Sequence, residues 1–496
     1  MYRKKDEAFY KRGGGRMADG GHGRTLHINM DERRLSVIVF SLFFSWLLAF
    51  PFEGQILYTL ADTFDILPDL MIFSAIAVHF AGLFLCGFFI KSMKAAKWLI
   101  LCSLAFCILA SCIFFFPPSF LWTVAIVSSS FLAGGCVAAW GFYFKSGTPK
   151  NERIKTAADG LICSNILMIL LNLATIYLSP YIGLGLSIIV LIIAFLFALQ
   201  LSEGRKTAVL TCPKQLDNAV RIRKPLAFLC LFIVIITINS GLMYQVLNPA
   251  YAHLQWLTSW YWAIPYIVAL FIMRNFPRKI NRTYILYIAI AMIGLSFISF
   301  ISMEHSATNY LLVNTLMLGA CGVYDLFWWS ILGEMLDLDT NPAKIIGTGL
   351  SANVLGVLLG GLIGKTSTSL GVQSPNSTLL ALAVVCVTIA ILPPLHKHLS
   401  DLLKDHAYLT VLSEMPLKEQ SKALENFTAL GQLTERESEI ATLLLKGKTY
   451  RRIAEELHVS ENTVKTHIKN IYSKFGIRSR IELINIMLEQ QFFPPK

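Results

Sequence analysis

The sequence predicts an all-α protein: a polytopic twelve-helix transmembrane bundle in two six-helix halves, followed by a small C-terminal tetrahelical domain. Of its 496 residues, 55% are hydrophobic and only 15% are charged, whereas a soluble domain has roughly 25% charged residues. Apolar runs recur with lengths near the roughly 20 residues that cross a bilayer. After residue 398 these runs stop, and short amphipathic segments with helix-capping residues follow.

The charges between the apolar runs predict which way the spans cross the membrane. Loops after even-numbered spans carry Lys and Arg, and loops after odd-numbered spans are nearly free of them, with Lys365 as the exception. Because Lys and Arg favour the cytoplasmic side, both chain ends are expected in the cytoplasm. The twelve predicted spans are 35–57, 68–90, 96–116, 118–145, 158–179, 182–201, 225–248, 253–274, 283–303, 309–336, 343–367 and 376–396.

The segments outside the spans divide the rest of the chain. Residues 1–34 are basic and rich in Gly, without an apolar core, which is typical of a disordered cytoplasmic tail. Residues 35–398 form the membrane domain. Residues 399–431 are charged and weakly amphipathic, which predicts a partly helical linker before a domain at 432–490.

The arrangement of six plus six spans with a long basic central loop resembles the major facilitator superfamily of transporters, over residues 35–398. After the second span, "GFFIKSMKAAK" keeps Gly87 and the basic residues of that family's loop motif, without its acidic partner. The resemblance implies two six-helix halves that enclose a central cavity.

An ionisable residue at bilayer depth marks a cavity or a pathway by default. Asp325 lies inside the tenth span, and Trp328 and Trp329 follow at i+3 and i+4 on one helix face. This group predicts a site for a cationic or hydrogen-bonding small molecule; an ion pair between helices is the alternative. Glu53, after Pro51 in the first span, is a second candidate, or else an interfacial carboxylate in contact with water.

Other unusual residues of the spans are interpreted as packing groups. His79 and Trp140 are weaker site candidates, for which packing is the favoured interpretation. Gly356, Gly360 and Gly364 recur at four-residue spacing, which permits close helix approach. Nine of the ten cysteines lie in or beside apolar runs, with no metal-ligand spacing. We find no catalytic motif, metal site or cofactor signature, so an enzyme is not predicted.

Residues 432–490 read as four short helices. Thr434 and Glu437 form a capping-box pattern at the first, and Ser460 is placed to cap the third. The third helix turns an apolar stripe to one side and Lys465, Thr466 and Lys469 to the other. Nine basic residues against three acidic ones between 446 and 480 favour a nucleic-acid partner, and the helix order is that of a helix-turn-helix domain.

The motifs "LTERESEI", "IAEELHVSENTVKTHIKNIYSKFG" and "RSRIEL" resemble the LuxR-type helix-turn-helix domain over nearly its full length. The resemblance implies that the third helix enters the major groove of double-stranded promoter DNA and that the fourth mediates homodimerisation. By position it places Lys465, Thr466 and Lys469 at base edges. It places Thr463, Arg451 and Lys474 at phosphates.

Together these features predict a membrane-bound one-component transcription regulator in a bacterial inner membrane. The bundle in the lipid bilayer would bind an unknown small-molecule ligand, and the tail would bind DNA. A transporter with a DNA-binding regulatory tail is the main alternative. In a third interpretation the bundle is a passive anchor for a constitutive DNA-binding tail.

Overall fold

The computed structural model describes residues 31–52, 54–204, 215–276, 282–368, 375–414, 433–480, 482–484 and 486. These residues form helices and connecting turns, with no strand among them. Twelve of the described segments are long and apolar enough to cross a membrane. Each coincides with a predicted span to within about five residues. The prediction of an all-α polytopic bundle is therefore confirmed.

The first half of the membrane region contains six of these spans, because its apolar runs alternate with short polar turns. Ser92, Ser119 and Ser179 each accept a hydrogen bond from a backbone N–H at the start of the helix that they precede. The helices are α1 (Glu32–Leu47), α2 (Gln55–Asp62), α3 (Asp69–Phe89), α4 (Met93–Cys112), α5 (Phe120–Ser146), α6 (Arg153–Tyr177) and α7 (Pro180–Leu199).

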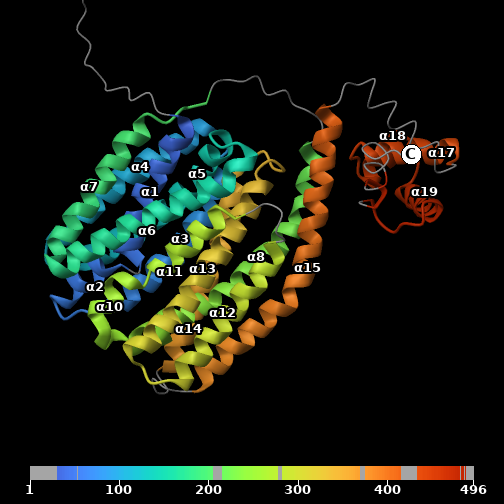
Figure 1. The fold of residues 1–496 in the computed structure, drawn as a ribbon. Coiled ribbons are helices and arrows are strands. Elements are labelled where there is room, and N and C mark those ends of the chain that lie inside the picture. Colours follow the sequence, from blue (N-terminus) through green and yellow to red (C-terminus); the bar gives the residue numbers. More distant parts are fainter. Residues whose placement is uncertain are drawn as a thin grey trace, which may run out of the picture.

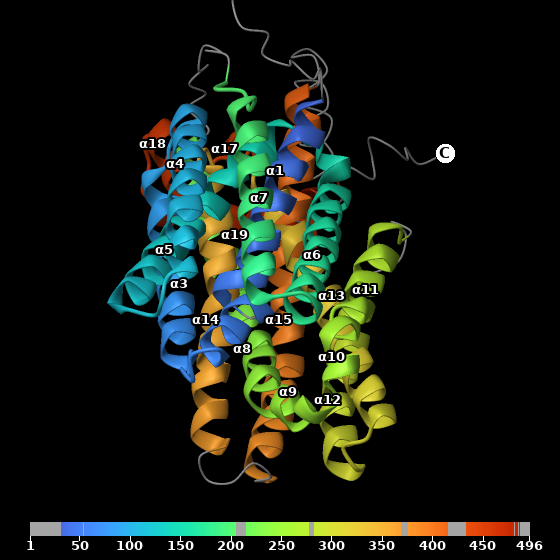
Figure 2. The ribbon, with the colours of Figure 1, turned by 90° about the vertical axis from the view of Figure 1, so that its left-hand side faces the viewer.

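The second half repeats the number of spans with more interruptions. Its helices are α8 (Gln215–Leu242), α9 (Asn248–Ala250), α10 (Gln255–Tyr261), α11 (Ile264–Arg274), α12 (Arg282–Ser302), α13 (Ala307–Met335), α14 (Pro342–Thr368) and α15 (Pro375–Glu414). In Figure 1, α1, α4, α6 and α7 lie on one side of the bundle and α8, α12 and α15 on the other. Figure 2 turns the first side toward the viewer.

The first span is interrupted where proline predicts a kink. A π-helical turn, Leu48–Phe52, follows α1 and contains Pro51, and the next helix starts only at Gln55. Proline has no N–H to donate to the preceding turn, which explains the local change of helical geometry. Glu53, the candidate next to this turn, lies outside the described residues.

Close packing of α14 against α8 depends on the predicted glycine stripe. A Cβ atom on Gly360 would lie 2.1 Å from the carbonyl oxygen of Ile238, and one on Gly356 would lie 2.0 Å from the hydroxyl of Thr237. No side chain fits at these distances, so glycine allows the two backbones to touch. The stripe therefore holds helices of the second half together.

The last helix extends beyond its membrane span. The span covers Leu379–His398, and α15 continues to Glu414 without a break. At a rise of 1.5 Å per residue, residues 399–414 form about 24 Å of helix. The first part of the predicted linker is thus a direct continuation of the last span.

The C-terminal domain has its own hydrophobic core. The described helices are α17 (Glu435–Leu445), α18 (Tyr450–Glu456) and α19 (Glu461–Lys474). Apolar side chains of all three, together with Leu483 and Ile484, form a buried cluster. Residues 482–484 are helical and belong to the predicted fourth helix. Ser479 caps the start of this helix, because its hydroxyl oxygen accepts a hydrogen bond from the Glu482 N–H at 3.3 Å.

Candidate functional site

Helix α19 begins at the capping residue that the sequence predicts. The Ser460 hydroxyl oxygen accepts a hydrogen bond from the backbone N–H of Thr463 at 3.0 Å. It also lies 2.8 Å from the Thr463 hydroxyl. The preceding turn requires a positive φ of 54° at His458. These contacts fix where the helix starts, and therefore which residues face inward.

The two faces of α19 separate as predicted. Val464, Ile468 and Ile471 are buried in the domain core, with at most 3% of their surface exposed. Lys465 and Lys469 are exposed on the opposite face. Thr466, between them, is exposed as well, and its hydroxyl donates to the carbonyl oxygen of Asn462. The exposed face is therefore basic and carries hydroxyl groups.

Two of the predicted DNA contacts form exposed intrahelical ion pairs. Lys465 lies 2.9 Å from Glu461, and Arg451 lies 3.1 Å from Glu455. The Arg451 side chain is 83% exposed. Exposed pairs of this kind contribute little stability. Both cations can therefore exchange these carboxylates for a phosphate or a base at small cost.

Lys474 differs from the other predicted contacts. Its ammonium group lies 2.6 Å from the carboxylate of Glu437, which is buried. Glu437 also accepts from the backbone N–H of Thr434 and completes the predicted capping box of α17. The hydrogen bond from Lys474, followed by that backbone bond, holds the pKa of Glu437 below its usual range. Lys474 thus ties the end of α19 to the start of α17.

A groove runs beside the exposed basic face of α19. It combines aromatic and cationic side chains, a combination that suits sugar and phosphate groups. Residues of α18, of α19 and of the turn after α19 line it: Tyr450, Lys465, Ile468, Lys469, Tyr472, Ser473, Ile477 and Arg478.

The membrane region contains a central cavity of about 200 Å³ between its two halves. The first half contributes side chains from α1, α3, α5 and α6, and the second half from α8, α11, α13 and α14 and from the turn before α11. Asp325 and Trp329 of α13 line the cavity, as does His79 of α3. Of the predicted ligand-site residues, Asp325 and Trp329 thus lie at one cavity, together with the weaker candidate His79.

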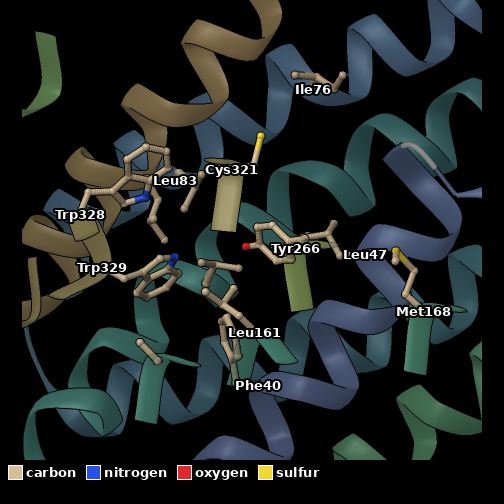
Figure 3. Close-up of a cluster of buried hydrophobic side chains, with 14 of the residues drawn as sticks. Phe40, Leu47, Ile76, Leu83, Leu161, Met168, Tyr266, Cys321, Trp328 and Trp329 are labelled. Carbon is tan, nitrogen blue, oxygen red and sulfur yellow. The ribbon is translucent and has the colours of Figure 1, made fainter. Parts of the chain in front are cut away.

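The carboxylate of Asp325 meets a tyrosine that the sequence did not single out. The Tyr266 hydroxyl on α11 donates a hydrogen bond of 2.7 Å to Asp325. Figure 3 shows the side chains of Tyr266 and Trp329 extending toward each other from α11 and α13. Trp328 is not among the residues that line the cavity, and its buried ring stacks on Tyr324 at 5.0 Å. Residues at i+3 and i+4 lie on opposite sides of residue i, and only Trp329 lies on the cavity side.

His79 and Trp140 have different positions. The ring of Trp140 is buried against Phe40 and Phe144, and its N–H donates to the Ser36 carbonyl at 3.1 Å. This is the packing role that the sequence favours. His79 is buried too, but its ring also lines the cavity.

Ion pairs join the two halves at the end of the bundle where α1 begins, here called the basic end. Arg153 of α6 forms two hydrogen bonds with Asp337, which follows α13, and Arg274 of α11 pairs with Asp159 of α6. Burial alone would raise the pKa of Asp337, but the Arg153 guanidinium lowers it below its usual value. A second cavity, of about 430 Å³, lies toward the other end and shares lining residues with the central one.

Sequence reasoning missed Tyr266, Glu437 and the Arg153–Asp337 pair. Tyr266 is one of many aromatic residues in the spans, and Glu437 was read only as a capping residue. Arg153 lies in the basic loop between the fourth and fifth predicted spans, and its partner lies 184 residues away in the sequence. Contacts between distant helices leave no periodic signal that would have identified them.

Comparison with known proteins identifies the C-terminal domain. The profile described as bacterial regulatory proteins, luxR family, matches residues 431–487. The chain is 40% identical over 60 residues to the spore germination protein GerE of Bacillus subtilis and covers 81% of that protein. It is 45% identical over 67 residues to the uncharacterized response regulatory protein YgeK of Escherichia coli. It is 47% identical over 58 residues to the transcriptional regulatory protein LiaR of B. subtilis.

These matches concern a small part of the chain. They cover 14%, 12% and 12% of it for YgeK, GerE and LiaR. The chain in turn spans less than half the length of YgeK, at 46%, and of LiaR, at 28%.

The membrane region is similar to a solved transporter. The crystal structure of the human organic anion transporter MFSD10 (TETRAN) aligns with a TM-score of 0.58 over 73% of this chain and 99% of that one. The identity is 14%, so the likeness concerns the fold. The resemblance to the major facilitator superfamily is thereby confirmed at the level of fold.

Proposed function

Because this chain belongs to the LuxR family of bacterial regulatory proteins through its C-terminal domain, we propose that it is a membrane-bound one-component transcription regulator. It lies in the bacterial inner membrane with both chain ends in the cytoplasm. The membrane bundle senses a small molecule. The C-terminal domain binds promoter DNA as a homodimer, with its fourth helix at the dimer contact.

The exposed basic face of α19 is the observation that carries the DNA-binding part. Lys465, Thr466 and Lys469 read base edges in the major groove, because the buried stripe of α19 turns them outward. Thr463 and Arg451 contact phosphates and set the register. Lys474, already paired with Glu437, holds α19 in the orientation that the other contacts need.

The cavity between the two halves supports the sensing part. A ligand there touches both halves, so it can favour one arrangement of the halves over another, provided that its affinity for the two differs. The ion pairs at the basic end are the contacts that such a shift would break or form. The unbroken helix α15 then carries movement of the last span as far as Glu414.

A transporter with a DNA-binding regulatory tail is the second candidate. The fold shared with a solved transporter and the neighbouring cavities between the halves favour it. Uptake into membrane vesicles separates the two functions. Substrate accumulation that survives deletion of residues 399–496 would support the transporter, and its absence would support the sensor.

The proposal is tested by chromatin immunoprecipitation of the full-length protein in its own host. We expect discrete promoter sites that disappear in a Lys465→Ala/Lys469→Ala variant present at the same level in the membrane. Lys446→Ala is the matched control, since Lys446 is an exposed lysine at the end of α17, outside α19. Unchanged promoter occupancy in the double variant would refute the DNA-binding role of α19.

A further inference from the structure

The central cavity has an unbalanced set of charges. Among its described lining residues, Asp325 is the one carboxylate, and none is lysine or arginine. His79 is the one imidazole there, and its Nδ1 lies 3.1 Å from the carbonyl oxygen of Ser130. A carbonyl only accepts hydrogen bonds, so Nδ1 is the donor and Nε2 of the neutral ring is an acceptor. The carboxylate of Asp325 and the acceptor nitrogen of His79 therefore favour a ligand that donates hydrogen bonds or is positively charged.

Asp325 itself has no cationic partner in the described part of the chain. Its hydrogen bond comes from the neutral hydroxyl of Tyr266. The described ion pairs that link the two halves involve other carboxylates, namely Asp337, Asp159 and Asp69. A carboxylate at bilayer depth is costly unless a cation or several hydrogen bonds compensate it. A bound cation would supply the missing charge.

Most of the remaining lining is aromatic or apolar, and its neutral polar residues are Asn165, Ser240 and Asn353. Phe44, Phe52, Tyr244, Trp262 and Trp329 present rings from both halves. Aromatic faces attract cations that lose their water, and they also pack against apolar groups. An apolar cavity of about 150 Å³ is enough for benzene, so about 200 Å³ accommodates a ligand with one ring.

We propose that this cavity binds a small organic monocation with an aromatic or other apolar body. Its ammonium group pairs with Asp325, and the rings enclose the rest of the molecule. An organic anion of the same shape would meet the carboxylate without any described lysine or arginine to balance it. This inference rests on the proposed function, since it names the class of small molecule that the bundle senses.

The test compares three probes with the same phenylethyl body: 2-phenylethyltrimethylammonium, the neutral 2-phenylethanol and the anionic 3-phenylpropanoate. The full-length protein is purified in detergent, and binding is followed by tryptophan fluorescence, because Trp262 and Trp329 line the cavity. We expect saturable binding of the cation, at least tenfold tighter than that of the other two. Equal or tighter binding of the anion, or no binding of the cation, overturns the proposal.

Substitutions in the full-length protein test where the cation binds. Asp325→Asn should lower the affinity for the cation at least tenfold, whereas Asp325→Glu, which keeps the charge, should retain most of that affinity. Asp62→Asn is the matched control, because Asp62 is an exposed carboxylate at the end of α2. Cation affinity that is unchanged in Asp325→Asn would overturn the assignment of Asp325. The comparison of probes on the unaltered protein decides the ligand class even if a variant does not fold.

Failure of the proposed regulatory function can be distinguished from failure of the proposed ligand class. Cation binding without promoter sites in chromatin immunoprecipitation would refute the regulator and leave the ligand class standing. Promoter occupancy that responds to the anion and not to the cation would refute the ligand class alone.

Discussion

The guanidinium of Arg153, at the start of α6, donates two hydrogen bonds to the carboxylate of Asp337, at 2.8 and 3.0 Å, and so joins the two halves of the bundle. The Arg153 side chain is only 5% exposed, and it also donates to the Gly333 carbonyl at 2.7 Å. A planar guanidinium whose two terminal nitrogens bind one carboxylate fixes orientation as well as distance. The pair therefore holds the halves together at the basic end.

Removing the charge of Asp337 should destabilise the protein. Asp337→Asn leaves the buried guanidinium without its counter-charge, at a cost of roughly 1.5–3 kcal/mol. Asp69→Asn is the control, since the side chains of Asp69 and Lys365 are both about half exposed. Loss of this ion pair should cost about 1 kcal/mol or less. Thermal unfolding of the detergent-purified variants measures both effects. An equal loss in the two variants would contradict the proposed role of Arg153.

Base-reading residues should change sequence preference. Lys465→Ala is expected to weaken binding to a promoter site identified by immunoprecipitation by roughly 1–3 kcal/mol, or about 5- to 150-fold. It should also relax the preference at the base pair that Lys465 contacts. Electrophoretic mobility shifts with single-base variants of that site measure this. Uniform weakening over all sequences would instead indicate a phosphate contact.

Arg451 should behave in the opposite way. Its side chain is 83% exposed on α18, and we propose that it contacts a phosphate. Arg451→Ala should weaken binding to all sequences alike and reduce the slope of log affinity against log salt concentration by about 1. Titrations at several salt concentrations check this, and a slope that stays unchanged excludes the contact.

The Glu437–Lys474 pair should make the stability of the C-terminal domain depend on pH. The pKa of Glu437 is lowered in the folded domain. The Glu437 carboxylate therefore contributes its full stabilisation of the fold above the pKa of glutamate in the unfolded chain, which is about 4.3. That contribution disappears as the pH falls through the lower folded pKa. We expect a steeper loss of stability below about pH 4.3 in the native domain than in Glu437→Gln. Urea unfolding of a fragment of residues 415–496 at several pH values tests this.

The exposed residue Glu439 provides the control for that measurement. The Glu439 side chain is 47% exposed and pairs with Arg436 at the surface, so Glu439→Gln should leave the pH profile nearly unchanged. A profile equally flat in both variants would contradict the assigned role of Glu437.

The glycine stripe of α14 should tolerate no side chain. Gly360→Ala would bring a methyl group to 2.1 Å from the Ile238 carbonyl oxygen, so the helices must separate, and overpacking of this kind costs roughly 1–3 kcal/mol. Gly185→Ala is the control, since its nearest neighbour would be 4.0 Å away. Yield of folded protein and thermal stability should fall for the first variant alone.

Features that depend on local patterns could be predicted from the amino-acid sequence. Apolar runs predicted the twelve spans, because the cost of exposing polar groups to lipid applies to each helix separately. Helical periodicity predicted the faces of α19, with Val464 inward and Lys465 outward, and the capping residues predicted where its helix begins. The glycine spacing predicted a close approach of helices without identifying the partner helix.

Contacts between residues far apart in the sequence could not be predicted and became known from the helix packing. Tyr266 reaches Asp325 across 59 positions, Arg153 reaches Asp337 across 184, and Lys474 reaches Glu437 across 37. The rotation of α13 about its axis decided that Trp329 and not Trp328 lines the cavity. These pairings follow from how helices pack against one another, and many different packings satisfy the same local pattern of apolar and polar residues.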